Sequence, residues 1–329
     1  MANSTVIPST KISIIPERNR GKPWFDDGNV ILMSNDRLEA MAFRVYKGMV
    51  AQHSPMLRAK LENGVTDVVY GCPAVQMDDS SADLSNFLTV IHGCERSLQL
   101  HSKQDFTTLV SVLRIATKYK ADALRKRALH PLERIYPPEL SEWDDNFESH
   151  SMIWHLDPVT VINVARELSV WSILPAAMAF LANSTLAQEA FGASVLQTQP
   201  LRFAPGLYQA CDMKAFTLMK EYNHASISKT LRFIREQAKE RHGSCQRLDG
   251  CGNKFTAAFI ALCVAAATSE GPAGYPTFVI TVQGVLQREE FCGSCRDRVE
   301  LGLQRRRRAW WRGLPEALGF SGWDDARLQ

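Results

Sequence analysis

Residues 43–57 read FRVYKGMVAQHSPML and combine a strand pattern with two helix starts. Every second side chain of residues 41–46 is apolar, which is typical of a strand with one buried face. A helical stretch begins at Lys47 and breaks before the second helix, where Ser54 is a favoured N-cap and Pro55 suits the first helical position. The stretch therefore predicts a strand followed by two short helices.

The neighbouring sequence extends this pattern. Val30–Met33 is a short apolar run between turn residues and predicts a strand buried on both faces, able to pair with residues 41–46 in a hairpin. We interpret residues 64–72 as a loop and residues 74–77 as a third short strand. Ser80-Ser81-Ala82-Asp83 resembles a capping box before an apolar helical repeat.

Two further helices follow, at Phe106–Tyr119 and Ala121–Ile135, on the same apolar spacing. Pro131 should kink or shorten the second, which must end before Pro137-Pro138. We therefore expect an α+β fold, in which a small sheet flanked by helices is followed by a mostly helical C-terminal region. Beyond residue 80, only Thr277–Val282 carries a comparable strand signal.

Composition and pattern divide the chain into five segments. We expect a disordered tail over 1–20, a mixed strand-and-helix unit over 21–136, an acidic and aromatic linker over 137–156, a helical region over 157–241, and a cysteine-containing helical region over 242–329.

Composition limits the function classes. The chain has 329 residues, of which 45% are hydrophobic and 22% charged, so a packed core is expected rather than disorder. The formal net charge of +3 does not favour a dedicated nucleic-acid binder. The N-terminus shows no basic stretch followed by an apolar one, so we expect no secretory signal and a cytoplasmic or nuclear protein with reduced thiols.

The residues also resemble a known family. Residues 43–57 resemble the BTB/POZ signature F-x-V-H-K-x-x-L-x-x-x-S-x-x-F, and the order strand, strand, helix, helix, strand, helix matches the opening of that domain. The similarity is closer to a large group of BTB proteins in mushroom-forming fungi and spans about 22–185. It is carried by WFDDGNVIL at 24–32, GCP at 71–73, ATKY at 116–119 and AREL at 165–168.

The resemblance implies a non-enzymatic protein–protein interaction protein. It implies a homodimer formed through the BTB domain, and it allows use as an adaptor for a cullin-type ubiquitin ligase. Tyr46 and Asn29 stand where the family usually has a histidine and an aspartate, which argues against the animal type of dimer pocket. Trp24 and Phe25 are candidate interface residues because aromatic anchors dominate interfaces; alternatively, they cover the core of their own domain.

No zinc-peptidase, nucleophile-elbow, P-loop or dinucleotide-binding motif occurs, so we expect no enzyme and assign no catalytic or cofactor-binding residues. A second function class is a transcription- or chromatin-associated regulator with a structural zinc site. The sequence lacks the C2H2 finger spacing that such BTB proteins carry.

Four C-terminal cysteines form two pairs, Cys245-x5-Cys251 and Cys292-x2-Cys295. Four thiolates in two pairs are what a closed structural zinc site requires, although the first spacing is wider than usual. Two other interpretations stay open: buried thiols on an amphipathic helix, and redox-sensitive cysteine pairs.

Arg305–Arg308 precedes Trp310 and Trp311 and is the only dense basic run. It could serve nuclear import or contact nucleic acid with stacked indoles. The near-neutral charge of the chain favours a solvated helix face whose tryptophans fold onto other helices.

Overall fold

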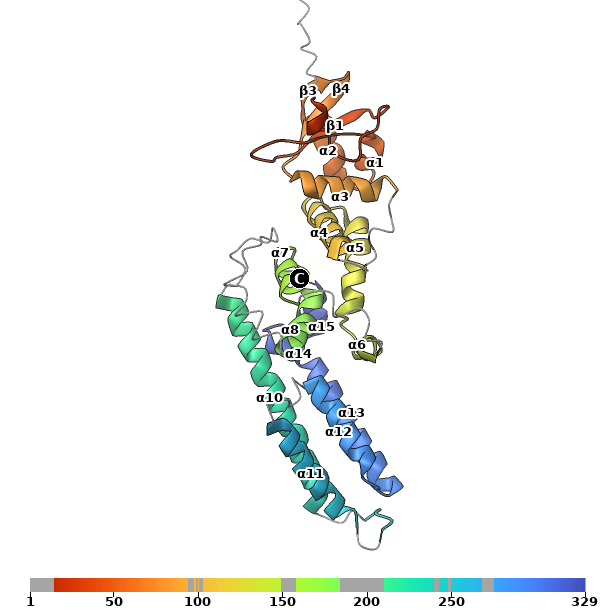
Figure 1. Cartoon of the computed structure of the whole chain (residues 1–329), viewed down its shortest axis with the longest axis vertical. Coiled ribbons are helices and arrows are strands. Elements are labelled where there is room, and N and C mark those ends of the chain that lie inside the picture. The colour runs from red at the N-terminus through yellow and green to blue at the C-terminus, as the bar shows by residue number, and fades with distance from the viewer. Residues whose placement is uncertain are drawn as a thin grey trace, which may run out of the picture. The chain divides into compact units, whose positions relative to one another are not determined.

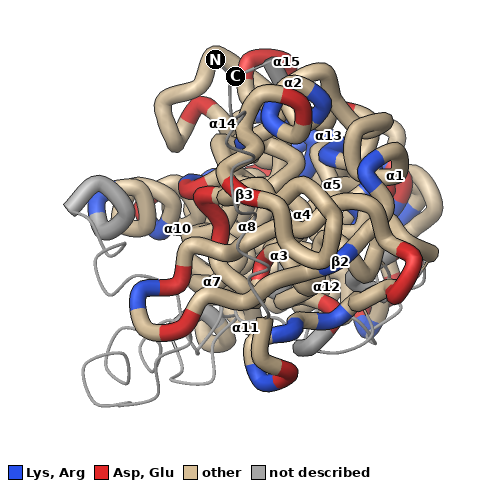
Figure 2. The backbone as a smooth tube through the Cα atoms, turned by 90° about the horizontal axis from the view of Figure 1, so that it is seen from above, with Lys and Arg blue, Asp and Glu red and all other residues tan. Residues whose placement is uncertain are grey.

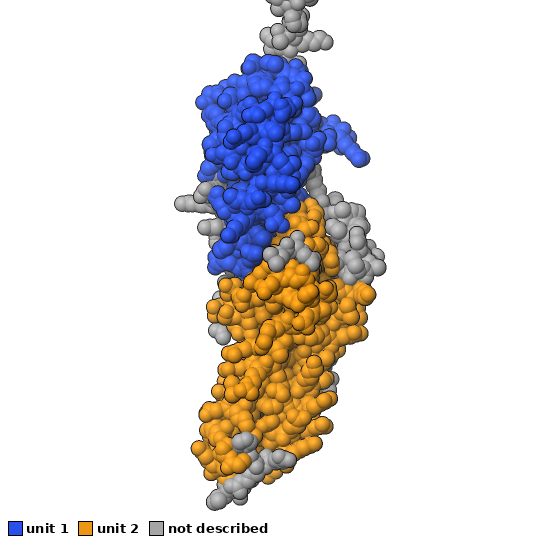
Figure 3. Space-filling model, turned by 180° about the vertical axis from the view of Figure 1, so that it is seen from behind, with its two compact units in different colours: residues 1–134 blue, residues 135–329 orange. Residues whose placement is uncertain are grey.

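The computed structural model describes residues 15–93, 98, 100, 103–148, 158–183, 210–239, 243–247, 250–267 and 275–328. The chain forms two compact units, Met1–Arg134 and Ile135–Gln329 (Figure 3). The fold is α+β, as expected, with one small sheet and many helices. Within the described part, no helix combines the length and apolar character needed to cross a membrane.

Unit 1 contains a four-stranded mixed sheet (Figure 1). Its strands are β1 (Val30–Met33), β2 (Ala42–Val45), β3 (Val65–Val69) and β4 (Cys72–Gln76), in the order β2-β1-β4-β3. β1 pairs antiparallel with β2 and parallel with β4. The first three residues of β1 are fully buried, which confirms the prediction of a strand covered on both faces.

The prediction of a loop over residues 64–72 is wrong, because β3 lies there and β4 already begins at Cys72. β3 is an edge strand whose first four residues are exposed, so it carries no apolar alternation that would reveal it. Tyr70 and Gly71 have φ values of 51° and 73° and make the tight turn to β4. At the edge, Asp67 Oδ1 accepts a hydrogen bond of 2.7 Å from the Val68 amide.

The helices of unit 1 are α1 (Lys47–Ala51), α2 (Pro55–Asn63), α3 (Ser81–Ile91), α4 (Lys103–Lys118) and α5 (Asp122–Ile135). Both predicted caps are confirmed. Ser54 Oγ accepts the Leu57 amide at 2.9 Å, and Ser80 Oγ accepts the Asp83 amide at 3.1 Å. α5 continues through Pro131 and ends before the double proline.

The predicted tail over 1–20 is wrong for its last six residues, and residues 1–14 lie outside the described part. Ile15 is buried against the sheet. Tyr70 Oη accepts a hydrogen bond from the Ile15 amide at 3.1 Å and donates to the Ile15 carbonyl at 3.0 Å. A short 3-10 helix, Glu17–Asn19, follows, and Arg20 pairs with Ala42 beside β2. Burial of the Ile15 side chain and backbone pairing of Arg20 with Ala42 therefore order residues 15–20.

In the described part of unit 2, all regular secondary structure is helical. Its helices are α6 (Leu140–Glu148), α7 (Pro158–Glu167), η4 (Trp171–Ile173), α8 (Leu174–Asn183), α10 (Ala210–Lys239), α11 (Gly252–Ala267), α12 (Tyr275–Arg288), α13 (Gly293–Arg312), α14 (Leu314–Ala317) and α15 (Trp323–Leu328). The strand signal at 277–282 is wrong, because these residues belong to α12. Buried side chains at Tyr275, Phe278, Val279 and Val282 show the helical period that the local β-branched residues obscured.

A cluster of aromatic side chains forms part of the hydrophobic core of unit 2. Trp143 of α6 is buried and packs against Phe180 and Trp311, at ring-centre distances of 6.5 Å and 5.2 Å. Trp311 also stacks on Trp323, at 5.3 Å. The structure therefore places a packed helix within 137–156, where we expected a linker, because Trp143 supplies a large apolar surface that needs burial.

Candidate metal centre

The four C-terminal cysteines converge in unit 2. Cys245 lies in the connection after α10, Cys251 immediately precedes α11, Cys292 is the N-cap of α13, and Cys295 lies in the first turn of α13. All four side chains are buried, and their sulfur atoms lie within 4.8 Å of one another. The pairs that the sequence separates by about forty residues therefore form one cluster.

The sulfur separations match tetrahedral metal coordination. Cys245 Sγ lies 3.9 Å from Cys251 Sγ and 3.8 Å from Cys292 Sγ. Four sulfur ligands at about 2.3 Å from a zinc ion would lie about 3.8 Å apart at the corners of a tetrahedron. These two separations therefore match a Zn(Cys)4 site, and all four sulfurs lie close enough together to hold one metal ion.

The local backbone favours a thiolate at Cys292. Hydrogen bonds from the backbone of Gln246 and of Cys295 lower the pKa of the Cys292 thiol to about 6. The partial positive charge of the α13 N-terminus acts in the same direction. Burial raises the pKa of Cys295 to about 12 and also raises the pKa of Cys251. A cation among the sulfurs would remove this penalty, because metal ligation deprotonates thiols.

Arg298 supplies positive charge next to the cluster. Its Nη2 atom lies 3.9 Å from Cys295 Sγ, and its Nε atom is buried without a hydrogen-bond partner. Four thiolates around Zn²⁺ carry a net charge of −2, so a partly buried guanidinium beside them lowers the electrostatic cost. Arg298 was not predicted from the sequence, although its position three residues after Cys295, on the same helix face, was a usable signal.

The surroundings of the cluster are apolar and closed. Phe255 and Phe291 stack at 4.4 Å between ring centres and belong to the same buried cluster as the cysteines. Gly250 has a φ of 72°, a conformation that glycine adopts without strain, and it sets the turn before Cys251. Four protein ligands inside an apolar shell fit a structural site, since a catalytic site keeps one position open.

Cys72 and Cys263 lie outside this cluster. Cys72 is buried in unit 1, with its sulfur 3.2 Å from the Gly28 carbonyl. Cys263 is half-buried on α11. These two positions provide matched controls for cysteine substitutions.

The candidate interface residues Trp24 and Phe25 both pack on their own unit and stay partly exposed. Trp24 meets Tyr70 edge to face at 6.2 Å and lies 5.0 Å from the Arg20 guanidinium. Phe25 contacts the rings of Tyr46 and His92 at 4.9 Å and 5.2 Å. Their rings therefore cover the end of the sheet and still offer surface to a partner.

The basic run lies on α13 and has the character of a helix face. Trp310 and Trp311 are buried, so neither indole is available for stacking on bases. Arg306 stacks on Phe233 at 3.7 Å, and Arg307 forms an ion pair with Asp144. Figure 2 shows basic and acidic residues interspersed along the backbone, in agreement with the small net charge of +3.

No family model, no curated protein and no solved structure matches the chain. The candidate metal centre is therefore assigned from the geometry of this chain alone.

Proposed function

We propose that the chain is a protein–protein interaction protein without catalytic activity, which acts through a BTB-like unit 1 and is related to BTB proteins of mushroom-forming fungi. The observation that carries this proposal is the order of elements. β1 and β2 form a hairpin, α1 and α2 follow, and the chain then returns with β4 parallel to β1 before α3. The resemblance of residues 43–57 implies this order, to which the edge strand β3 is an addition.

The surface of unit 1 supports a docking role. Exposed apolar side chains occur on α1, α2 and β3, at Met49, Met56, Val65 and Val68. Methionine is enriched at protein interfaces, where its flexible side chain adapts to a partner. We propose self-association as the first use of this unit and binding to a cullin-type scaffold as the second.

Size-exclusion chromatography with light scattering on the full chain tests self-association. We expect a dimer, and we expect Met56→Glu to shift it toward monomer because a buried carboxylate opposes an apolar interface. Leu38→Glu is the matched control, since Leu38 is fully exposed and lies apart from these elements. A monomer at all concentrations would contradict self-association, and equal effects of the two variants would contradict an interface at Met56. A pull-down with a cullin N-terminal region tests the second use.

We also propose that Cys245, Cys251, Cys292 and Cys295 hold a structural Zn²⁺ ion. The sulfur distances, the apolar neighbours and the partly buried cation at Arg298 support this choice, and soft thiolates favour zinc over hard cations. Metal analysis of the purified chain should give one zinc per molecule.

The alternative function, a chromatin-associated regulator, would use the same site and would be supported by salt-dependent binding of DNA or RNA.

A further inference from the structure

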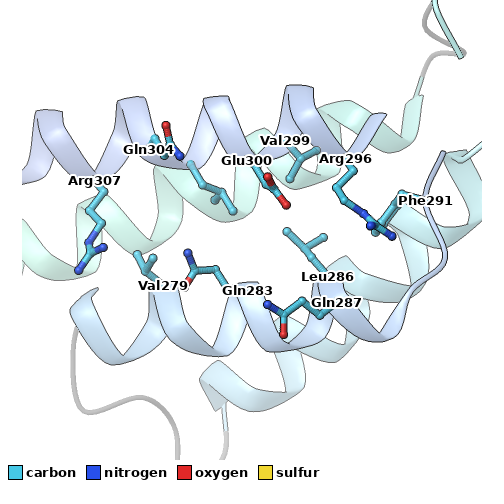
Figure 4. Close-up of a pocket in the computed structure, with 11 residues that line it drawn as sticks. Val279, Gln283, Leu286, Gln287, Phe291, Arg296, Val299, Glu300, Gln304 and Arg307 are labelled. Atoms are coloured by element: carbon cyan, nitrogen blue, oxygen red, sulfur yellow. The ribbon is translucent and has the colours of Figure 1, made fainter. Parts of the chain in front are cut away.

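A groove of about 450 Å³ lies between α12 and α13 (Figure 4). Its lining mixes apolar side chains, among them Leu286, Val299 and Leu303, with charged and amide groups. In Figure 4 the labelled side chains come from α12 on one side and from α13 on the other, except Phe291, which lies in the connection between the two helices. The volume lies within the range of ligand-binding clefts.

The rim of the groove presents alternating charge along α13. Arg296, Glu300 and Arg307 all line it, so the order is cation, anion, cation. Arg296 and Glu300 are exposed, and in the described part of the chain neither side chain has a hydrogen-bond or ion-pair partner. Eleven residues separate the two arginines, which corresponds to about 16 Å at 1.5 Å per residue. A helix of about three turns would span that distance.

One helix of this chain already packs beside this face of α13. The acidic helix α6 packs there, with Trp143 against Trp311 at 5.2 Å and the Asp144 carboxylate on Arg307. An aromatic anchor combined with a carboxylate–arginine pair therefore already holds one acidic amphipathic helix at the Arg307 end of the groove. The remainder of the groove, toward Arg296, offers a second guanidinium and the partly exposed side chain of Leu286.

We propose that the α12–α13 groove binds an acidic amphipathic helix of a partner protein. An apolar side chain would contact Leu286, a carboxylate would pair with Arg296, and an amide or basic side chain would face Glu300. In this mode of docking, an amphipathic helix is bound through its apolar face and through charged residues at the rim of the groove. The inference goes beyond the proposed function, because it requires neither self-association of unit 1 nor a particular metal.

The test uses a fluorescent peptide with the sequence of residues 138–148, PELSEWDDNFE, titrated into the full chain in zinc-containing buffer. Fluorescence anisotropy should show saturable binding in the micromolar range. Arg296→Glu should weaken binding by about tenfold or more, because the rim cation becomes an anion. Arg305→Glu, on the exposed side of the same helix and outside the groove, should change it less than about twofold.

A second pair of variants tests the apolar floor. Leu286→Ser should weaken binding about fivefold, through loss of buried apolar contact. Leu301→Ser is its matched control, since Leu301 is exposed on α13 and does not line the groove. A peptide with its acidic residues replaced by lysine should bind at least about tenfold more weakly. Unchanged thermal unfolding of each variant excludes misfolding as the cause.

Four outcomes would overturn the proposal. The first is no saturable binding of the peptide, and the second is equal weakening by Arg296→Glu and Arg305→Glu, which indicates non-specific attraction. The third is normal binding to Arg296→Glu and Leu286→Ser with loss only on Arg307→Ala, because the peptide would then replace α6 on its own site. The fourth is efficient competition by a single-stranded RNA oligonucleotide.

Discussion

Cys295 is the cluster cysteine whose substitution should be most damaging, because it is deeply buried and contacts Arg298. We expect Cys295→Ser to abolish zinc binding and to destabilise unit 2 by more than about 4 kcal/mol, the range seen on loss of a structural metal. Cys263→Ser, outside the cluster, should cost less than about 1 kcal/mol. Zinc content and urea denaturation measure both variants. Full zinc occupancy in Cys295→Ser would remove the site.

His92 and His53 should make unit 1 sensitive to acid. Burial lowers the pKa of both imidazoles, and Arg127 lowers that of His53 further. Each pKa is therefore lower in the folded than in the unfolded state, so the unfolded chain binds more protons as the pH falls. Stability should be complete above about pH 6.5 and decline toward pH 5. Urea midpoints across this range should show the decline.

The matched variant for this titration is the double substitution His53→Gln/His92→Gln. Its midpoint should depend less on pH than that of the parent chain, whatever its absolute stability. An unchanged slope would show that other groups control the acid response.

Single residues also explain why part of the candidate site was accessible from sequence. The two cysteine pairs are local signals, and the C-x2-C spacing places both thiols at one helix start. Their meeting is not local, because it depends on α11 and α12 returning the chain to the end of α10. Spacing alone places Arg298 on the same helix face as Cys295, but only the structure shows that its Nε atom is buried and its Nη2 atom lies beside the sulfur.

At the scale of elements, adjacent serines give a controlled test of helix capping. Ser80 Oγ accepts the Asp83 amide, whereas Ser81 is the first residue of α3 and does not cap it. Ser80→Ala should destabilise unit 1 by about 1 kcal/mol. Ser81→Ala should stay within about 0.5 kcal/mol. Chemical denaturation of both variants decides the matter, and equal effects would show that the cap contributes nothing.

Elements with a complete local signature were predictable. β1, β2, α2 and α3 each combine an apolar period with a cap or a turn, and the structure has them at the expected places. β3 and α12 were missed for opposite reasons. β3 is held by its pairing with β4 rather than by burial. In α12, the packing of buried side chains at helical spacing overrides the strand preference of the β-branched residues.

At the scale of the whole molecule, the two units can be followed separately. Trp24 is the only one of the seven tryptophans that lies in unit 1, so intrinsic fluorescence reports mainly on unit 2. Adding a zinc chelator should lower the fluorescence-detected melting temperature, because an ion bound only to the folded state stabilises it. The Cys295→Ser variant should not respond to chelator. A response as large as that of the parent chain would contradict a metal-linked unit 2.

The hydrogen bond from the Val68 amide to Asp67 has a consequence that a single molecule does not reveal. An edge strand with exposed valines can pair with a strand of another molecule and so start aggregation. The Asp67 carboxylate opposes such pairing, because it accepts the hydrogen bond of the Val68 amide. Asp67→Val should leave the folded monomer nearly as stable as before but turn concentrated solutions turbid, which light scattering on storage would detect. Solubility in a crowded cell would then depend on one acidic side chain at the rim of a small sheet.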